Sequence, residues 1–222
     1  MYKKLFLLII ISILPGIFSC LGVMLQIFPA LFYILSKLTF LGLPLIYWRL
    51  RGFNFKKLIA HYKINEFKIS FGIISGLFIS VLILLSFFFY FKENLDGSQL
   101  KFMLDKFDLI KYFIVMAIFI SFWNSFIEEY YWRMFVLDFS DDILKSIKLR
   151  IIWNGLFFSV HHFFILMAYL PTNYAIIFSV GTGFGGMIWA YMRVKNLSIW
   201  QCYVSHLLVD LSVMYIGYMM IM

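Results

Sequence analysis

Charged side chains are scarce in this sequence. They make up 14% of its 222 residues, whereas roughly 25% is usual in a soluble protein. The hydrophobic share is 64%, and the mean hydropathy is +0.93. A soluble domain of this length needs a polar surface that such a composition does not provide. The scarcity excludes a soluble globular protein, a disordered chain and a nucleic-acid-binding domain, and it predicts a protein with several membrane spans.

Cysteines and the signatures of common proteases are also scarce or missing. Cys20 and Cys202 both lie in apolar stretches, and two cysteines do not make a disulfide framework, so we expect two small packing residues. The sequence has no HExxH zinc motif and no GxSG serine motif. Asp210 is the one aspartate well within an apolar segment, which excludes the membrane aspartate pair of presenilin-like enzymes.

Long apolar runs fill the chain instead. A membrane-spanning helix needs about 20 mostly apolar residues, and seven segments qualify: 5–26, 29–48, 69–91, 112–137, 150–170, 174–192 and 197–219. The first resembles a signal peptide, but its apolar run continues to Phe28 and no soluble domain follows, so we expect an uncleaved span. The predicted fold class is all-α, a polytopic transmembrane helical bundle of about seven spans.

The connections between these segments differ in charge. Basic residues gather before the first span and in the connections after the second, fourth and sixth spans, for example at Arg49, Arg51, Lys56 and Lys57. Because cytoplasmic loops carry the excess of Lys and Arg, we expect a multi-pass membrane protein with its N-terminus in the cytoplasm. Connections 49–68 and 98–111 fit either short amphipathic surface helices or solvated loops, and solvated loops are the simpler interpretation.

Ionisable residues inside the spans are few and clustered. They are Glu128, Glu129 and Arg133 in the fourth span, His161 and His162 in the fifth, and His206 and Asp210 in the seventh. Such residues are costly in a membrane and are functional candidates by default. With a rise of 1.5 Å per residue, Glu128, His161 and His206 lie about 15 Å below the same surface. The three helices can therefore bring them into one site. Lys37 is an ionisable residue of the second span that lies apart from this cluster. Its side chain can extend to the membrane surface or form an ion pair.

Two of these residue pairs are spaced for contact on one helix face. Glu129 and Arg133 are four residues apart and can form an ion pair. His206 and Asp210 have the same spacing, so Asp210 can orient the imidazole. Buried acid–base pairs also serve only to hold helices together, and His162 points away from His161 by one helical step. The spacing leaves both interpretations open for these residues.

A glutamate and two histidines can activate water in two ways. The carboxylate can take a proton from water with help from a neighbouring imidazole. Alternatively, two histidines and a carboxylate can hold a metal ion that lowers the pKa of bound water. Both routes produce a nucleophile suited to hydrolysis of an acyl bond, and a positioned imidazole would stabilise the oxyanion.

Three motifs follow one another on these helices. Residues Glu128 to Arg133 read EExxxR, Phe157 to His161 read FxxxH, and His206 to Asp210 read HxxxD. In this order, over about residues 112–219, they resemble the CPBP family of intramembrane proteases, with its CAAX prenyl endopeptidases and its bacterial Abi proteins tied to bacteriocin self-immunity. The resemblance implies an intramembrane metalloendopeptidase, a hydrolase, that acts in bacteriocin processing or self-immunity.

The resemblance also implies roles for individual residues. Glu128 corresponds to the water-activating glutamate and His161 to its assistant, although Phe158 with His162 also fits FxxxH. His206 and Asp210 correspond to the oxyanion-stabilising or metal-side pair, and Glu129 and Arg133 to a supporting ion pair. A divalent metal such as zinc would be held by Glu128, His161 and His206, and a metal-free glutamate mechanism stays open.

The division of the chain follows from these motifs. We expect N-terminal scaffold helices and loops in residues 1–111 and a catalytic core of four transmembrane helices in residues 112–219. Expected partners are the lipid bilayer and a peptide or membrane-protein substrate, with no nucleic acid; the oligomeric state stays open. Gly181, Gly183, Gly185 and Gly186 are expected at helix contacts.

Two other classes of protein remain as alternatives. The first is a non-enzymatic membrane immunity protein or receptor that reuses the fold and keeps the polar cluster for packing. The second is a proton-coupled transporter, which the lack of an internal repeat disfavours.

Overall fold

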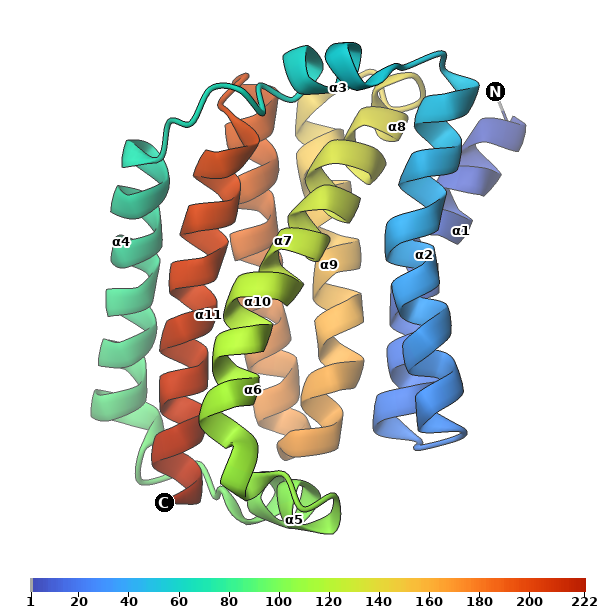
Figure 1. The fold of residues 1–222 in the computed structure, drawn as a ribbon. Coiled ribbons are helices and arrows are strands. Elements are labelled where there is room, and N and C mark those ends of the chain that lie inside the picture. Colours follow the sequence, from blue (N-terminus) through green and yellow to red (C-terminus); the bar gives the residue numbers. More distant parts are fainter. Residues whose placement is uncertain (1) are drawn as a thin grey trace.

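Seven helical segments run up and down between the two ends of the bundle (Figure 1). The structure is a computed structural model, and it describes residues 2–222. The segments long and apolar enough to span a membrane are Tyr2–Met24, Pro29–Leu50, Ser70–Phe91, Ile110–Asp141, Ile147–Tyr169, Thr172–Val194 and Ile199–Ile221. All seven predicted spans are confirmed, and residues 2–222 contain no β-strand, so the all-α fold class is confirmed too.

Among the first four spans, the second is a single α-helix, and the other three combine α-helical turns with tighter or wider turns. In chain order they are α1 (Tyr2–Ser19) with the π-helical η1 (Cys20–Met24); α2 (Pro29–Leu50); α4 (Ser70–Ser86) with the π-helical η2 (Phe87–Phe91); and η3 (Ile110–Tyr112), α6 (Phe113–Phe119), η4 (Ile120–Asn124), α7 (Ser125–Glu129), η5 (Tyr130–Val136) and α8 (Leu137–Asp141). The last three spans are the single helices α9 (Ile147–Tyr169), α10 (Thr172–Val194) and α11 (Ile199–Ile221).

Two short helices lie across the ends of the bundle. α3 (Phe55–His61) covers the end near the N-terminus, and α5 (Ser98–Lys106) covers the end near the C-terminus (Figure 1). Solvated loops were the simpler expectation here, and they are wrong at both places. At α3 the reason is local, because the Asn54 side chain accepts a hydrogen bond from the Lys57 backbone N–H at 2.9 Å and caps the helix. These ends are called the α3 end and the α5 end below.

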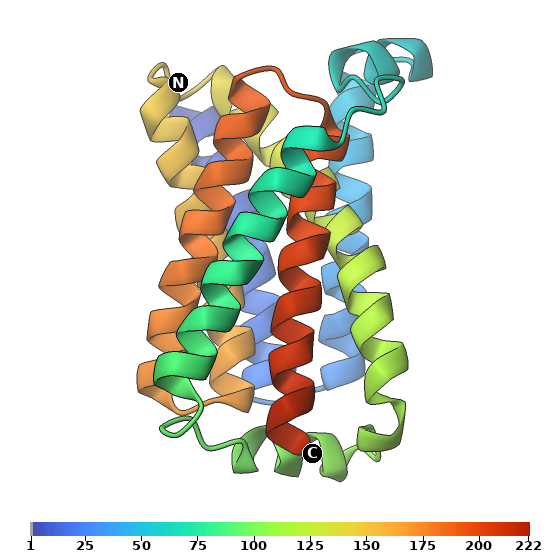
Figure 2. The same ribbon diagram turned by 90° about the vertical axis from the view of Figure 1, so that its left-hand side faces the viewer.

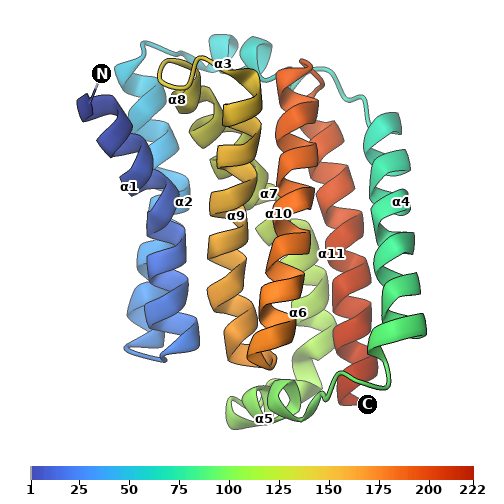
Figure 3. The same cartoon turned by 180° about the vertical axis from the view of Figure 1, so that it is seen from behind.

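Glycines set how closely the helices pack. From behind, α1, α9, α10, α11 and α4 follow one another across the bundle (Figure 3), and from the side α4 crosses directly in front of α11 (Figure 2). A Cβ added to Gly72 of α4 would lie 2.4 Å from the Gln201 carbonyl oxygen of α11. Gly183 of α10 meets α9 closely, as expected, but Gly181 has nothing within 4 Å, so its predicted helix contact is wrong.

Pro15 shapes the first span where it meets the fourth. A proline has no N–H, so the carbonyl group four residues earlier, at Ile11, lacks its helical donor. The hydroxyl group of Tyr131 donates to that carbonyl oxygen at 2.6 Å. Tyr131 is fully buried and packs against Phe40 of α2, with ring centroids 4.6 Å apart. The first, second and fourth spans are thus joined at the level of Glu128 and Glu129.

Candidate active site

Glu128 lies in a buried turn of the fourth span between two π-helical segments. The π turns η4 and η5 flank the short helix α7 that carries it, and such turns are frequent at functional sites. The Glu128 side chain is 2% exposed. Its Oε1 accepts a hydrogen bond from Asn124 Nδ2 at 2.6 Å, whereas its buried Oε2 has no hydrogen-bond partner. One carboxylate oxygen is therefore fixed and the other is available.

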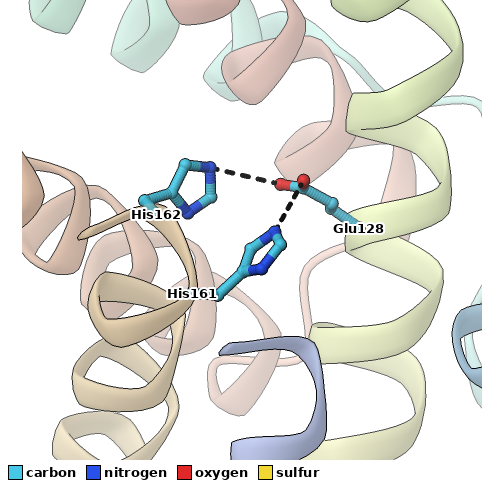
Figure 4. A group of neighbouring side chains, drawn as sticks. All are labelled: Glu128, His161 and His162. Carbon is cyan, nitrogen blue, oxygen red and sulfur yellow. Dashed lines mark ion pairs between the residues drawn. The ribbon is translucent and has the colours of Figure 1, made fainter. Parts of the chain in front are cut away.

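Both histidines of the fifth span face this carboxylate (Figure 4). His161 Nε2 lies 3.6 Å from Glu128 Oε1, and His162 Nε2 lies 3.7 Å from Glu128 Oε2. His162 was expected to point away from His161, and that expectation is wrong. The two rings are 4.9 Å apart at an angle of 79°, so adjacent residues of α9 reach the same carboxylate from two sides.

The second nitrogen of each ring is held by backbone or hydroxyl groups. His162 Nδ1 lies 2.9 Å from the Phe158 carbonyl oxygen, and His161 Nδ1 lies 3.0 Å from Ser19 Oγ and 3.3 Å from the Pro15 carbonyl oxygen. A carbonyl oxygen only accepts hydrogen bonds. The carbonyl contacts therefore favour a proton on Nδ1 in both rings and direct the Nε2 lone pairs toward Glu128.

His206 of the seventh span is held between carboxylates. Its Nδ1 lies 2.9 Å from Glu129 Oε1, and its Nε2 lies 3.5 Å from Asp210 Oδ1 and 3.7 Å from Glu128 Oε2. The ring stacks on Trp189, with centroids 4.1 Å apart. Asp210 accepts a hydrogen bond from the Ser125 hydroxyl at 2.6 Å. The shared depth expected for Glu128, His161 and His206 is thus present as direct proximity.

Glu129 and Arg133 form the expected ion pair. Each of the two side chains also contacts further residues that the spacing did not indicate. Arg133 Nε lies 3.4 Å from Glu129 Oε2, and both residues are about 1% exposed. The guanidinium group also lies over the rings of Phe158, at 4.5 Å, and Trp189, at 5.0 Å. Since Glu129 Oε1 contacts His206, the pair connects directly to the imidazole rather than standing apart from the site.

Three residues could hold a metal ion together. Ligand atoms of Glu128, His161 and His162 all lie within 4.8 Å of one another. The unpartnered Glu128 Oε2 and the two Nε2 lone pairs are ligands that zinc accepts, so the donor set fits. It includes His162, whereas the sequence pattern favoured His206, whose two nitrogens face Glu129 and Asp210.

Sequence patterns missed several residues of the site. Asn124 stands four residues before Glu128, and that spacing on one helix face was a usable signal. Ser125 has the same spacing from Glu129, but its partner Asp210 lies on another helix. Ser19 and Trp189 contact histidines of other spans, and no spacing within one helix indicates such contacts.

Comparison with known families agrees with the motifs. The model of the family described as type II CAAX prenyl endopeptidase Rce1-like matches residues 110–212. That range contains all the motif residues from Glu128 to Asp210. No curated protein and no solved structure matches the chain. The matched segment is thus similar to the CAAX protease family that the three motifs resemble. The class supported is a protease, and thus a hydrolase, with multiple membrane spans.

Proposed function

We propose that this protein is an intramembrane endopeptidase in which Glu128 activates the attacking water. The observation that carries the proposal is the buried, unpartnered Glu128 Oε2, which lies 3.7 Å from both His162 Nε2 and His206 Nε2. These separations are too long for direct hydrogen bonds but suit a water molecule bridging the groups.

The surrounding residues support each proton transfer. Glu128 takes a proton from the water, and the resulting hydroxide attacks the peptide carbonyl carbon. Because carboxylates face both nitrogens of His206, the ring can carry a proton on Nε2 as well as on Nδ1, and the Nε2–H group donates a hydrogen bond to the oxyanion without transferring its proton. Glu128 then passes its proton to the leaving amine as the carbon–nitrogen bond breaks. Glu129 and Arg133 hold His206 in place.

Glu128, His161 and His162 would hold a divalent metal such as zinc. The bound metal would supply Lewis acidity and lower the pKa of a water on it. The two Nδ1 contacts described above keep the Nε2 atoms directed inward whether or not a metal takes part.

The substrate we propose is a peptide or membrane protein whose scissile bond can enter the bundle. Basic residues gather at the α3 end, which supports a cytoplasmic N-terminus. A bacterial plasma membrane as the location rests on the resemblance to the bacterial members. The narrower role, bacteriocin processing or self-immunity, rests only on the resemblance to Abi-type proteins. Prenylated peptides belong in a substrate screen because the matching family is named for them.

The decisive test is cleavage by the purified protein in lipid nanodiscs. A quenched peptide library, with and without prenyl groups, would be offered to the wild type, to Glu128→Gln and to the matched control Glu93→Gln. Glu93 lies in the exposed connection at the α5 end. We expect Glu128→Gln to lose about 100- to 10,000-fold in rate and Glu93→Gln to cleave normally. Normal cleavage by Glu128→Gln would contradict the role of Glu128, whereas a wild type that cleaves none of the peptides would favour an immunity protein or receptor.

Metal content tests the ligand set separately. Zinc would be measured by mass spectrometry in the wild type and in His161→Ala, His162→Ala and His206→Ala. Loss in the first two variants, with retention in the third, would support the Glu128, His161 and His162 set. Full cleavage after chelation would favour the metal-free glutamate mechanism.

A further inference from the structure

Lys37 is an ionisable residue of the second span that the mechanism above does not use. Its ammonium group lies 5.3 Å from the ring centroid of Tyr33 and 5.9 Å from that of Phe40. It donates a hydrogen bond to Asn124 Oδ1 at 2.8 Å. Among residues 2–222 it has no carboxylate within 4.0 Å. A membrane-embedded cation without a carboxylate in direct contact is costly and calls for a functional explanation.

Asn124 carries the contact from Lys37 to the candidate active site. The other end of its amide group, Nδ2, donates to Glu128 Oε1 at 2.6 Å. Lys37, Asn124 and Glu128 therefore form a continuous chain of hydrogen bonds from α2 to the carboxylate. No other polar side chain of the second span makes a side-chain hydrogen bond to Asn124 or Glu128 in the described residues.

The chemistry of lysine determines the direction of this chain. The two ends of an asparagine amide have nearly the same shape, but one accepts and the other donates hydrogen bonds. An ammonium group only donates, so the amide must present its oxygen to Lys37. Its nitrogen then faces Glu128. Without Lys37, the amide of Asn124 could turn over whenever Glu128 holds a proton, and its oxygen would then accept a hydrogen bond from the carboxyl group.

This direction matters for the available oxygen of Glu128. Because Asn124 occupies Oε1, the unpartnered Oε2 is the oxygen left to face His162 and His206. We propose that Lys37 is a positioning residue that acts through Asn124 to hold the Glu128 carboxyl group in this orientation. The proposal rests on the proposed function in taking Glu128 as the group that activates water, but the hydrogen-bond chain can be measured without a substrate.

Nuclear magnetic resonance of the glutamate carboxyl carbons tests the chain directly. The sequence has four glutamates, at positions 66, 93, 128 and 129, so selective labelling gives few signals, and Glu128→Gln assigns the one from Glu128. We expect Lys37→Met to shift this signal and Lys37→Arg, which keeps a donor, to retain most of its position. Lys92→Met is the control, because Lys92 also lies over a phenylalanine ring, Phe88 at 5.9 Å, but at the exposed end of the third span.

Kinetics test the consequence once a substrate is known. We expect Lys37→Met to lower kcat about 10- to 100-fold with little change in KM, and Lys37→Arg to recover most of the rate. Asn124→Leu should lose a similar factor. Adding Lys37→Met to Asn124→Leu should cost little more, because Lys37 acts through the residue already removed.

The outcomes separate the two proposals. An unchanged Glu128 signal in Lys37→Met, or additive rate losses in the double variant, would overturn the positioning role while cleavage by the wild type would still support the protease. If the wild type cleaves nothing but Lys37→Met moves the Glu128 signal, the protease proposal fails and the hydrogen-bond chain stands. Should Lys37→Met fail to fold, Asn124→Leu removes the same donor to Glu128 and is read by the same signal.

Discussion

The two halves of the chain contribute different things to the site. Residues 110–221 supply its carboxylates, its three histidines and Arg133. Residues 2–106 supply no motif, yet Pro15 and Ser19 contact His161, and Lys37 contacts Asn124. The second half thus carries the reactive groups. The first half contacts His161 directly and Glu128 through Asn124, and these contacts orient the two side chains. Helices that look like mere scaffold in a sequence can therefore set the orientation of catalytic groups.

The second and sixth spans, one from each half, also differ in how firmly they are packed. Of the residues in the most apolar window of α2, 11% are buried, against 39% for α10. α2 is therefore held by specific contacts rather than by broad burial, and those near Glu128 include Phe40 with Tyr131 and Lys37 with Asn124. The second half depends on a continuous interior. The predictions below challenge this contrast, beginning with the largest expected effect.

Removing the buried cation of the second half should cost the most stability. Arg133→Met removes the guanidinium counter-ion from the buried Glu129 carboxylate, and we expect a loss of about 3–5 kcal/mol in the free energy of unfolding. The control is Arg51→Met, which breaks the ion pair of Arg51 with Asp142 between two exposed side chains and should cost below about 1 kcal/mol. Unfolding in mixed micelles would measure both. Equal losses of unfolding free energy in the two variants would show that the buried ion pair stabilises the protein no more than the exposed pair does.

The two halves pack closely against each other where α4 meets α11. Gly72→Ala would place a methyl group 2.4 Å from the Gln201 carbonyl oxygen, so α4 must shift, and we expect a loss of about 1–3 kcal/mol. Gly42→Ala is the control from the same half, since nothing lies within 4 Å of its added Cβ. Because alanine favours a helix interior over glycine, Gly42→Ala should stabilise by about 0.5–1 kcal/mol. Thermal unfolding of both variants tests the difference in sign.

Much of this architecture could be predicted from the sequence, but contacts between helices could not. Apolar length alone identified the seven spans, since each helix must be long enough to cross a bilayer. Depth along the spans correctly grouped Glu128 with His161 and His206. It could not show that His162 also faces Glu128 or that Ser19 contacts His161, because those facts depend on how α9 is rotated and which helix lies beside it. The residue roles stay predictions.

A smaller effect should follow from removing one contact of the first half. Ser19→Ala deletes the hydroxyl group at His161 Nδ1 but leaves the Pro15 carbonyl oxygen. A typical hydrogen bond contributes about 0.5–1.5 kcal/mol, so we expect a rate loss below about tenfold. The nitrogen-15 signal of His161 should move while its tautomer is kept. The control is Ser12→Ala, because Ser12 lies on α1 like Ser19 and contacts Trp153, which lies on α9 like His161. Its loss should leave the His161 signal unchanged. A change of tautomer in Ser19→Ala would show that the serine, rather than the carbonyl group, orients His161.

The smallest effect is expected outside the membrane, where charges of the first half meet Asp142. Burial raises the pKa of this carboxyl group, but the hydrogen bond from Arg51 and the charges of Arg51 and Lys4 outweigh it, so the pKa in the folded protein is lowered. The stabilisation is therefore present above the ordinary aspartate range and is lost as the pH falls through the lowered pKa. Because both partners are well exposed, Asp142→Asn should cost less than about 0.5 kcal/mol at neutral pH. The difference in unfolding free energy from the wild type should shrink toward about pH 3. A difference that grows on acidification would contradict this assignment and mean that the Arg51 contact does not stabilise the ionised carboxylate.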